Sequence, residues 1–241
     1  MSGTFRVVGL GPGDPELMTV KAARLIAAAP VVAYFAKRDR TGHARTIAAG
    51  QVGAEAEELR FEYPFTTEVA LEDPRYRAEI VQFYDACAER LAERLRSGRD
   101  GVLLCEGDPF FYGSSMYIFD RLRTEFRSEV VPGISAMSGC WSRALTPIAH
   151  GDDVLRVLPG TLDEEGLARE LSAADAAVIM KVGRNMPKIR AALARAGLAD
   201  RAVYVERGTM SAERIMPFVD VEDGPAPYFS LVLVPGRQGV R

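Results

Sequence analysis

Cysteine and histidine are scarce in this sequence, and their scarcity excludes several kinds of site. Among 241 residues there are three cysteines, Cys87, Cys105 and Cys140, and two histidines. The cysteines stand far apart and form no CxxC pair, so neither a disulfide framework nor a zinc site is indicated. We expect all three cysteines to be reduced, buried, small apolar residues, and we predict no metal site.

The sequence also lacks a long hydrophobic run and an excess of basic residues. Its longest apolar segment, residues 26–36, is interrupted by Pro30 and is well short of the roughly 20 residues that cross a bilayer. The formal charge of -3 argues against the strongly basic surface of a general nucleic-acid binder. The first residues, MSGTFRVVGL, do not have the pattern of a signal peptide. We therefore expect a cytoplasmic protein that binds neither membrane nor nucleic acid.

Short apolar runs alternate with helical patterns from one end of the chain to the other. Such alternation is typical of α/β units built on a largely parallel sheet. The predicted strands are residues 5–10, 31–36, 101–105, 128–133, 153–158, 175–183, 201–206 and 227–234. The predicted helices are residues 19–29, 73–97, 113–125, 135–145, 163–171 and 187–197, with Thr19, Asp73 and Ser114 as N-caps of the first three. We therefore predict two α/β domains, residues 1–132 and 133–241, each with a mostly parallel or mixed sheet flanked by helices.

The loop GLGPGDPEL (residues 9–17) joins the first predicted strand to the first predicted helix. A dinucleotide fingerprint GxGxxG would need glycine where the chain has Asp14, and the phosphate-binding pattern GxxxxGK[ST] is absent. A pyrophosphate at this loop would face the Asp14 carboxylate. The sequence therefore disfavours a nicotinamide oxidoreductase, and a tight turn without a ligand is an equally good interpretation of this loop taken alone.

The segment CEGDPFFYGSS (residues 105–115) follows an apolar run at the same kind of junction between strand and helix. In open α/β sheets the carboxyl ends of the strands gather at the ligand crevice. Asp108 beside Gly107 favours a ligand with hydroxyl groups or a positive charge over one with phosphates. A ribose diol, a sulfonium or an amino group fits that description.

Five motifs, taken together, carry a resemblance over nearly the whole chain. They are GLGPGDPELMT, CEGDPFFYGS, VPGISAM, VIMKVGRN and YVERGTM. In this order and at this spacing the chain resembles the tetrapyrrole methylases, two-domain methyltransferases of the cobalamin and sirohaem pathways that use S-adenosylmethionine (SAM). With Glu106 before GDP, and with DDVLRVLP, MKVGRN and YVERGTM, it is most similar to the members that methylate precorrin-2 at C20. Gly208, where many relatives have alanine, is a small departure from the pattern.

The resemblance implies a site as well as a fold. It implies that SAM lies in a cleft between the two domains, held largely by backbone, and leaves as S-adenosylhomocysteine. The implied cofactor-binding residues are Pro12, Glu106, Gly107, Asp108, Phe111, Ser135, Ala136, Lys181, Val182, Gly208, Thr209 and Met210. For Ser135, a structural role as a helix N-cap is an equally good interpretation. The resemblance further implies the tetrapyrrole precorrin-2 as substrate and a homodimer, while the residues do not distinguish precorrin-2 from cobalt-factor II.

Methyl transfer asks the protein mainly to hold an electron-rich carbon against the methyl group, to exclude water and to let a proton leave afterwards. Asp108 is the carboxylate best placed to act as the base, followed by Glu106 and Glu206. A polycarboxylate substrate needs cations, because arginine and lysine bind carboxylates. The candidate substrate-binding residues are Lys37, Arg38, Arg40, Tyr112, Arg184 and Arg207. For each cation, a solvated surface charge is the alternative.

Other functions stay open on the sequence alone. The same fold could methylate another position of a tetrapyrrole, or a protein or ribosomal RNA, although an RNA substrate would favour a basic domain. A carrier that binds a tetrapyrrole or a nucleotide without turnover belongs to a different class. Transfer of a methyl group distinguishes the enzyme from the carrier.

Overall fold

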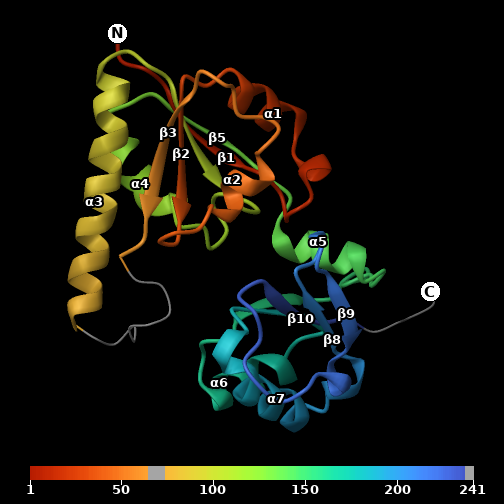
Figure 1. The fold of residues 1–241 in the computed structure, drawn as a ribbon. Helices are drawn as coiled ribbons and strands as arrows, with labels where there is room; N and C mark the ends of the chain where they lie inside the picture. The colour runs from red at the N-terminus through yellow and green to blue at the C-terminus, as the bar shows by residue number, and fades with distance from the viewer. Residues whose placement is uncertain (65–73, 237–241) are drawn as a thin grey trace. The chain divides into compact units, whose positions relative to one another are not determined.

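The computed structural model describes residues 1–64 and 74–236 of the chain (Figure 1). The chain divides into two compact units, Met1–Ser135 and Ala136–Arg241. The division predicted from the sequence follows residue 132, whereas Gly133 hydrogen-bonds to Asp108 and belongs to the first unit. No helix in the described ranges has both the length and the apolar character needed to cross a membrane.

The first unit is built on a five-stranded sheet in which all neighbouring strands are parallel. The strands are β1 (Phe5–Gly9), β2 (Val31–Ala36), β3 (Glu57–Glu62), β4 (Gly101–Cys105) and β5 (Ser128–Val131). Their order is β3-β2-β4-β1-β5, so β1 lies between β4 and β5. Because the strands run in the same direction, the loops that follow them leave from one edge of the sheet.

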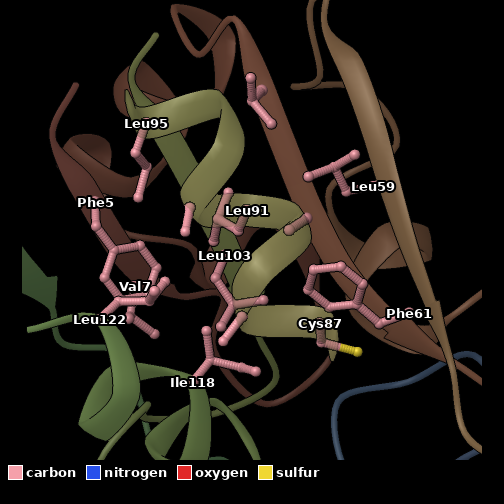
Figure 2. Close-up of a cluster of buried hydrophobic side chains, with 14 of the residues drawn as sticks. Phe5, Val7, Leu59, Phe61, Cys87, Leu91, Leu95, Leu103, Ile118 and Leu122 are labelled. Atoms are coloured by element: carbon pink, nitrogen blue, oxygen red, sulfur yellow. The ribbon is translucent and has the colours of Figure 1, made fainter. Parts of the chain in front are cut away.

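Helices cover both faces of this sheet. They are α1 (Val20–Ala27), α2 (His43–Ile47), α3 (Pro74–Arg96) and α4 (Ser115–Leu122), with a 3-10 turn at Pro15–Leu17. α3 and α4 pack on one face, where Figure 2 shows Leu91 and Leu95 of α3 close to Phe5 and Leu103 of the sheet. α1 and α2 pack on the other face. Leu91 and Leu95 are fully buried, and each such side chain stabilises the fold by roughly 1.5–3 kcal/mol.

The second unit is built on a mixed sheet of five strands. They are β6 (Leu155–Pro159), β7 (Ala176–Met180), β8 (Val203–Glu206), β9 (Arg214–Pro217) and β10 (Ser230–Val234). In the order β6-β7-β10-β8-β9, β6 and β7 are parallel, whereas β10 is antiparallel to both of its neighbours and β9 is antiparallel to β8. β6, β7 and β8 therefore run in one direction, and the loops that follow them share an edge.

Helices also cover both faces of the second sheet. α5 (Ala136–Arg143) packs on one face, and α6 (Glu164–Ser172) and α7 (Met186–Arg195) pack on the other. Three short 3-10 turns lie at Gly183–Asn185, Ala199–Arg201 and Phe218–Asp220. Each unit thus has its own core, and the prediction of α/β units with parallel or mixed sheets is confirmed.

The predicted strands and helices all occur, with ends that differ by a few residues, but α2, β3 and β9 were not predicted. α2 has five residues, too few to show a helical period. β3 (EELRFE) and β9 (RIMP) each lie at one edge of their sheet. β3 alternates apolar and charged residues, and β9 has only four residues, one of them proline, so neither contains a continuous apolar run; the other two edge strands, β5 and β6, were predicted.

Two of the three predicted N-caps can be checked. Thr19 caps α1, since its side-chain oxygen accepts the Ala22 N–H at 3.1 Å. Ser114 stands at the N-cap of α4 but makes no capping bond, because its backbone is already helical, with φ of -62° and ψ of -18°. Ser114 therefore occupies the predicted N-cap position without a side-chain capping bond, and Asp73 lies outside the described residues.

Candidate functional site

Three glycines bring the carboxyl ends of β4, β1 and β5 into backbone contact. Gly9 ends β1, Gly107 follows β4 and Gly133 follows β5. A Cβ atom on Gly133 would lie 2.1 Å from the Gly107 carbonyl oxygen, and one on Gly9 would lie 2.6 Å from the Gly133 nitrogen. No side chain fits at such distances, and Gly107 also has a φ of +66° that favours glycine. We call these three residues the glycine contact.

Hydrogen bonds tie the same loops together. Gly107 donates its N–H to the Gly11 carbonyl at 2.8 Å, and Gly11 donates back to the Gly107 carbonyl at 3.4 Å. The Asp108 carboxylate accepts the Phe110 N–H at 3.0 Å through Oδ1 and the Gly133 N–H at 3.1 Å through Oδ2. Asp108 therefore links the loop after β4 to the loop after β5, and each of its oxygens accepts a backbone hydrogen.

Glu106 connects the loop after β4 to α2. Its Oε1 accepts the Ala44 N–H at 3.0 Å, across 62 positions of sequence. Ala44 lies in the first turn of α2, whose own N-cap, Gly42, has no side chain to accept that hydrogen. A carboxylate at a helix start satisfies an unpaired N–H and interacts favourably with the helix dipole. Glu106 thus fixes the position at which the chain after β2 enters α2.

Three predicted cations lie in the turn after β2. Lys37, Arg38 and Arg40 are exposed, and within the described part of the chain none of them forms an ion pair. β2 is parallel to its neighbour β4, so this turn leaves the sheet at the edge that carries Glu106 and Asp108. The structure therefore brings these cations and the acidic loop to one edge of the first unit, as the sequence predicted.

The aromatic residues after Asp108 lie at the surface of the first unit. The Phe111 and Tyr112 rings meet edge to face, with centroids 4.8 Å apart. Tyr112 is 45% exposed and has a φ of +57°, which is rare for a bulky residue. Tyr117 is half exposed and stacks on the buried Tyr84, so it serves packing in α4. Pro12, in the loop after β1, is buried and presents little beyond its backbone.

The loops after β7 and β8 leave from the same edge of the second sheet and contain unusual backbone conformations. Lys181 has a φ of +56°, Arg207 of +49° and Thr209 of +69°. A residue with a side chain at positive φ is uncommon, and a β-branched residue such as threonine is a clear outlier. Each such residue costs about 1–3 kcal/mol and tends to occur at binding and catalytic sites. These conformations mark the edge as the candidate site of the second unit.

The N–H groups of Arg207, Thr209 and Met210 all donate within the second unit. In order, they donate to the Phe229 carbonyl at 2.7 Å, the Glu213 carboxylate at 2.7 Å and the Arg207 carbonyl at 2.9 Å. These three N–H groups are therefore not available to a ligand. In the first unit the N–H groups of Leu10, Gly11, Gly107 and Phe111 are likewise used internally. Each of these N–H groups is thereby lost as a donor to a phosphate.

Glu206 is a buried anchor of the second edge. Its side chain is 5% exposed, pairs with Arg207, and lies 3.7 Å from the Arg214 guanidinium. The Tyr204 hydroxyl donates to Glu206 at 3.2 Å and lies 3.0 Å from the Ser230 hydroxyl. Burial raises the pKa of Tyr204, which keeps that hydroxyl protonated. Glu206 is thus enclosed by two guanidinium groups, and this geometry does not suit the base role considered from the sequence.

The other predicted residues lie on these two edges or at the unit boundary. Val182 is fully buried in the core of the second unit, so only its backbone can face a ligand. Arg184 is exposed in the 3-10 turn after β7. Ser135 ends the first unit, and Ala136 begins α5 in the second. Within residues 1–64 and 74–236, no group of three or more His, Cys, Asp or Glu side chains is arranged to hold a metal ion.

Some residues that shape the site were missed from the sequence. Gly9 and Gly133 belong to the quoted motifs GLGPGDPEL and VPGISAM, so their contact could have been suspected from paired glycines after neighbouring strands. Glu213 holds the Thr209 N–H, but it stands in SAERI, a segment without any motif. Nothing in the sequence indicates that contact.

Known proteins resemble this chain in sequence and in structure. Residues 4–219 match the family model of Tetrapyrrole (Corrin/Porphyrin) Methylases. A Precorrin-2 C(20)-methyltransferase of Sinorhizobium sp is 54% identical over 229 residues, which cover 95% of this chain and 94% of the relative. A Cobalt-precorrin-2 C(20)-methyltransferase of Salmonella typhimurium is 27% identical, with 97% of each chain covered.

A solved structure supports the fold. The uroporphyrin-III C-methyl transferase of Thermus thermophilus, complexed with S-adenyl homocysteine, superimposes with a TM-score of 0.65 at 24% identity. The superposition covers 97% of this chain and 92% of that one. The two proteins therefore share their fold.

Because of the glycine contact, we expect two Gly→Ala substitutions to lower the free energy of unfolding by different amounts. Gly133→Ala places a methyl group 2.1 Å from a carbonyl oxygen, so we expect it to lower the free energy of unfolding by roughly 3 kcal/mol or more. Gly50→Ala is the matched control, because a Cβ there meets nothing within 4 Å; we expect a change within about 0.5 kcal/mol. Urea denaturation of both variants checks this, and similar midpoints would refute it.

We expect substitutions at Gly208 and Cys140 to have coupled effects on stability. A Cβ on Gly208 would lie 2.6 Å from the Cys140 sulfur and 3.1 Å from a Val205 methyl group, which gives a local reason for glycine here. We expect Gly208→Ala to destabilise by about 1–3 kcal/mol. Adding Cys140→Ala removes the sulfur and should recover part of that loss, with a coupling of at least about 0.5 kcal/mol in a double-mutant cycle. Strictly additive effects would show that the two sites are independent.

Proposed function

The chain belongs to the tetrapyrrole methylases, and from that membership we propose that it is a SAM-dependent methyltransferase that methylates precorrin-2 at C20 in cobalamin biosynthesis. The observation that carries this proposal is the 54% identity to a Precorrin-2 C(20)-methyltransferase over nearly the whole of both chains. The product is then precorrin-3A. The lower identity of 27% to a Cobalt-precorrin-2 C(20)-methyltransferase favours the metal-free substrate over cobalt-factor II.

The chemistry of the two loop edges fits SAM. Their backbone N–H groups are largely used internally, which leaves carbonyl oxygens that attract amino, hydroxyl and cationic groups. Glu106 and Asp108 add negative charge at the first edge. When bound, SAM supplies a methyl group on a sulfonium, which an electron-rich carbon displaces in line. The proposed contacts are Pro12, Glu106, Gly107, Asp108, Phe111 and Ser135 in the first unit, and Ala136, Lys181, Val182, Gly208, Thr209 and Met210 in the second.

The substrate is a polycarboxylate, and the proposed partners of its carboxylates are cations at strand ends. Lys37, Arg38 and Arg40 are the best supported, because they are exposed and are not neutralised by an acidic residue within the described part of the chain. Arg184 is also exposed, whereas Arg207 already pairs with Glu206 and offers a carboxylate only part of its guanidinium. Tyr112, exposed beside Phe111, is proposed to lie against the macrocycle.

Asp108 is the proposed base that accepts the proton leaving C20. Its position in the loop after β4, beside Gly107, supports this role. Both oxygens accept backbone hydrogens, so the loop geometry holds the carboxylate in one orientation, and a proton would go to a remaining lone pair. The same hydrogen bonds give Asp108 a structural role, and a test must separate the two.

The remaining features of the proposal concern location and assembly. We propose a homodimer in the cytoplasm, on the strength of the family resemblance, with neither a nucleic acid nor a membrane as partner. The alternative from another class is a carrier that binds SAM or a tetrapyrrole without turnover. No feature described above favours the carrier over the enzyme.

Anaerobic incubation of the protein with SAM and precorrin-2, in parallel with cobalt-factor II, tests the function. We expect the tetrapyrrole to gain one methyl group, faster on precorrin-2, with NMR placing it at C20. S-Adenosylhomocysteine should form in equal amount. Tight binding of SAM without methyl gain on either tetrapyrrole would reject C20 methylation and favour the carrier or another substrate.

Asp108→Asn tests the proposed base. The asparagine Nδ2 would face a backbone N–H, so we expect the variant to lose one loop hydrogen bond and some thermal stability. In folded protein we expect turnover to fall by about 10²-fold or more while SAM affinity, measured by calorimetry, changes much less. Unchanged turnover would remove Asp108 from the chemistry, and a parallel loss of affinity and turnover would assign it to loop structure alone.

A further inference from the structure

Glu213 contacts the segment of residues 207–210 and α5 at the same time. Its Oε2 accepts the Thr209 N–H at 2.7 Å. Arg143, at the end of α5, donates to the same carboxylate, with Nη2 2.8 Å from Oε1 and Nε 3.0 Å from each oxygen. The Glu213 side chain is only 15% exposed. The carboxylate therefore binds the Arg143 guanidinium on one side and accepts a backbone N–H of the loop on the other.

The conformation of Thr209 needs such support. A β-branched residue at a φ of +69° is in a sparsely populated region, and it persists only when the surrounding contacts hold it there. Met210 also accepts the Glu213 N–H through its carbonyl at 3.1 Å. Glu213 thus binds two consecutive residues of the loop, one through its side chain and one through its backbone.

The negative charge of Glu213 suits a side chain that accepts the Thr209 N–H. An ionised carboxylate only accepts hydrogens, so it cannot turn an O–H donor toward the Thr209 N–H. The hydrogen bond from Arg143 is the main reason that the pKa of Glu213 lies below its usual range, so the side chain stays ionised. An arginine fork also fixes the plane of the carboxylate it binds, which a single contact does not.

We propose that Glu213, oriented by Arg143, is a positioning residue for the cofactor. It holds Thr209 in its left-handed conformation and so sets the direction of the carbonyl oxygens of Gly208 and Thr209, whereas those of Arg207 and Met210 accept N–H groups of the same loop. The inference rests on the proposed function, because it requires this segment to contact SAM. Neither Glu213 nor Arg143 needs to touch the cofactor.

Three variants test the proposal, with affinity for S-adenosylhomocysteine measured by calorimetry and KM for SAM measured with precorrin-2. We expect Glu213→Ala to lower the affinity and to raise the KM by about tenfold or more each, since it removes a charge-assisted hydrogen bond. Glu213→Gln keeps an acceptor oxygen and should recover most of that affinity. Arg143→Ala leaves the carboxylate in place but unoriented, and we expect a loss of about threefold. In each case kcat should fall less than kcat/KM for SAM.

Glu170→Ala is the matched control, because it breaks the ion pair with Arg156 of β6 in the same unit, away from residues 207–210. We expect it to leave the affinity unchanged. Folded Glu213→Ala with wild-type affinity would overturn the proposal, and so would an equal loss in Glu170→Ala. If Glu213→Ala does not fold, Arg143→Ala decides: wild-type affinity in that variant would then overturn the proposal. A wild-type protein that binds neither SAM nor S-adenosylhomocysteine would instead reject the proposed function.

Discussion

The approach of three backbones at Gly9, Gly107 and Gly133 is the constraint on which the first unit's candidate site depends. A parallel sheet places all its carboxyl-end loops at one edge, but it does not bring them into contact. The loops can touch because the three glycines have no side chains. The Asp108 carboxylate can then connect the loop after β4 to the loop after β5. Glu106 extends the same arrangement to α2. The acidic loop is therefore a rigid part of the fold whose position the sheet determines.

Both units follow the same rule in their use of the backbone. Several N–H groups at the site edges, among them those of Gly107, Phe110 and Thr209, donate to neighbouring loops, to Asp108 or to Glu213. A phosphate-binding loop does the opposite and directs its N–H groups toward the ligand. This use of the N–H groups distinguishes the chain from dinucleotide-binding folds more directly than Asp14 in the first glycine-rich loop does. It agrees with a cofactor that carries positive charge and hydrogen-bond donors.

The sequence was informative where local chemistry decides the structure. Continuous apolar runs identified the central strands, and the rule that ligand loops follow strand ends put Asp108, Lys181 and Arg207 at sheet edges. β3 was not predicted, because its apolar residues Leu59 and Phe61 alternate with charged ones and form no continuous run. The partners of Glu106 and Glu213 could not be predicted either. These contacts depend on which loops the folded sheet brings together, across 62 positions in the case of Glu106 and Ala44, and no local pattern encodes that.

The strained residues of the second unit explain why its carboxylates differ in role. Arg207 and Thr209 both have positive φ, and each is next to or bonded to a glutamate, Glu206 or Glu213. Glu206 is enclosed by Tyr204 and two arginines, so its contribution is to hold the end of β8. Glu213 directly precedes β9, and its carboxylate holds Thr209 in the segment after β8, where the backbone has no ladder. Without a ladder, other contacts must maintain the strained conformation, and an ionised carboxylate oriented by arginine is well suited to hold the Thr209 N–H in place.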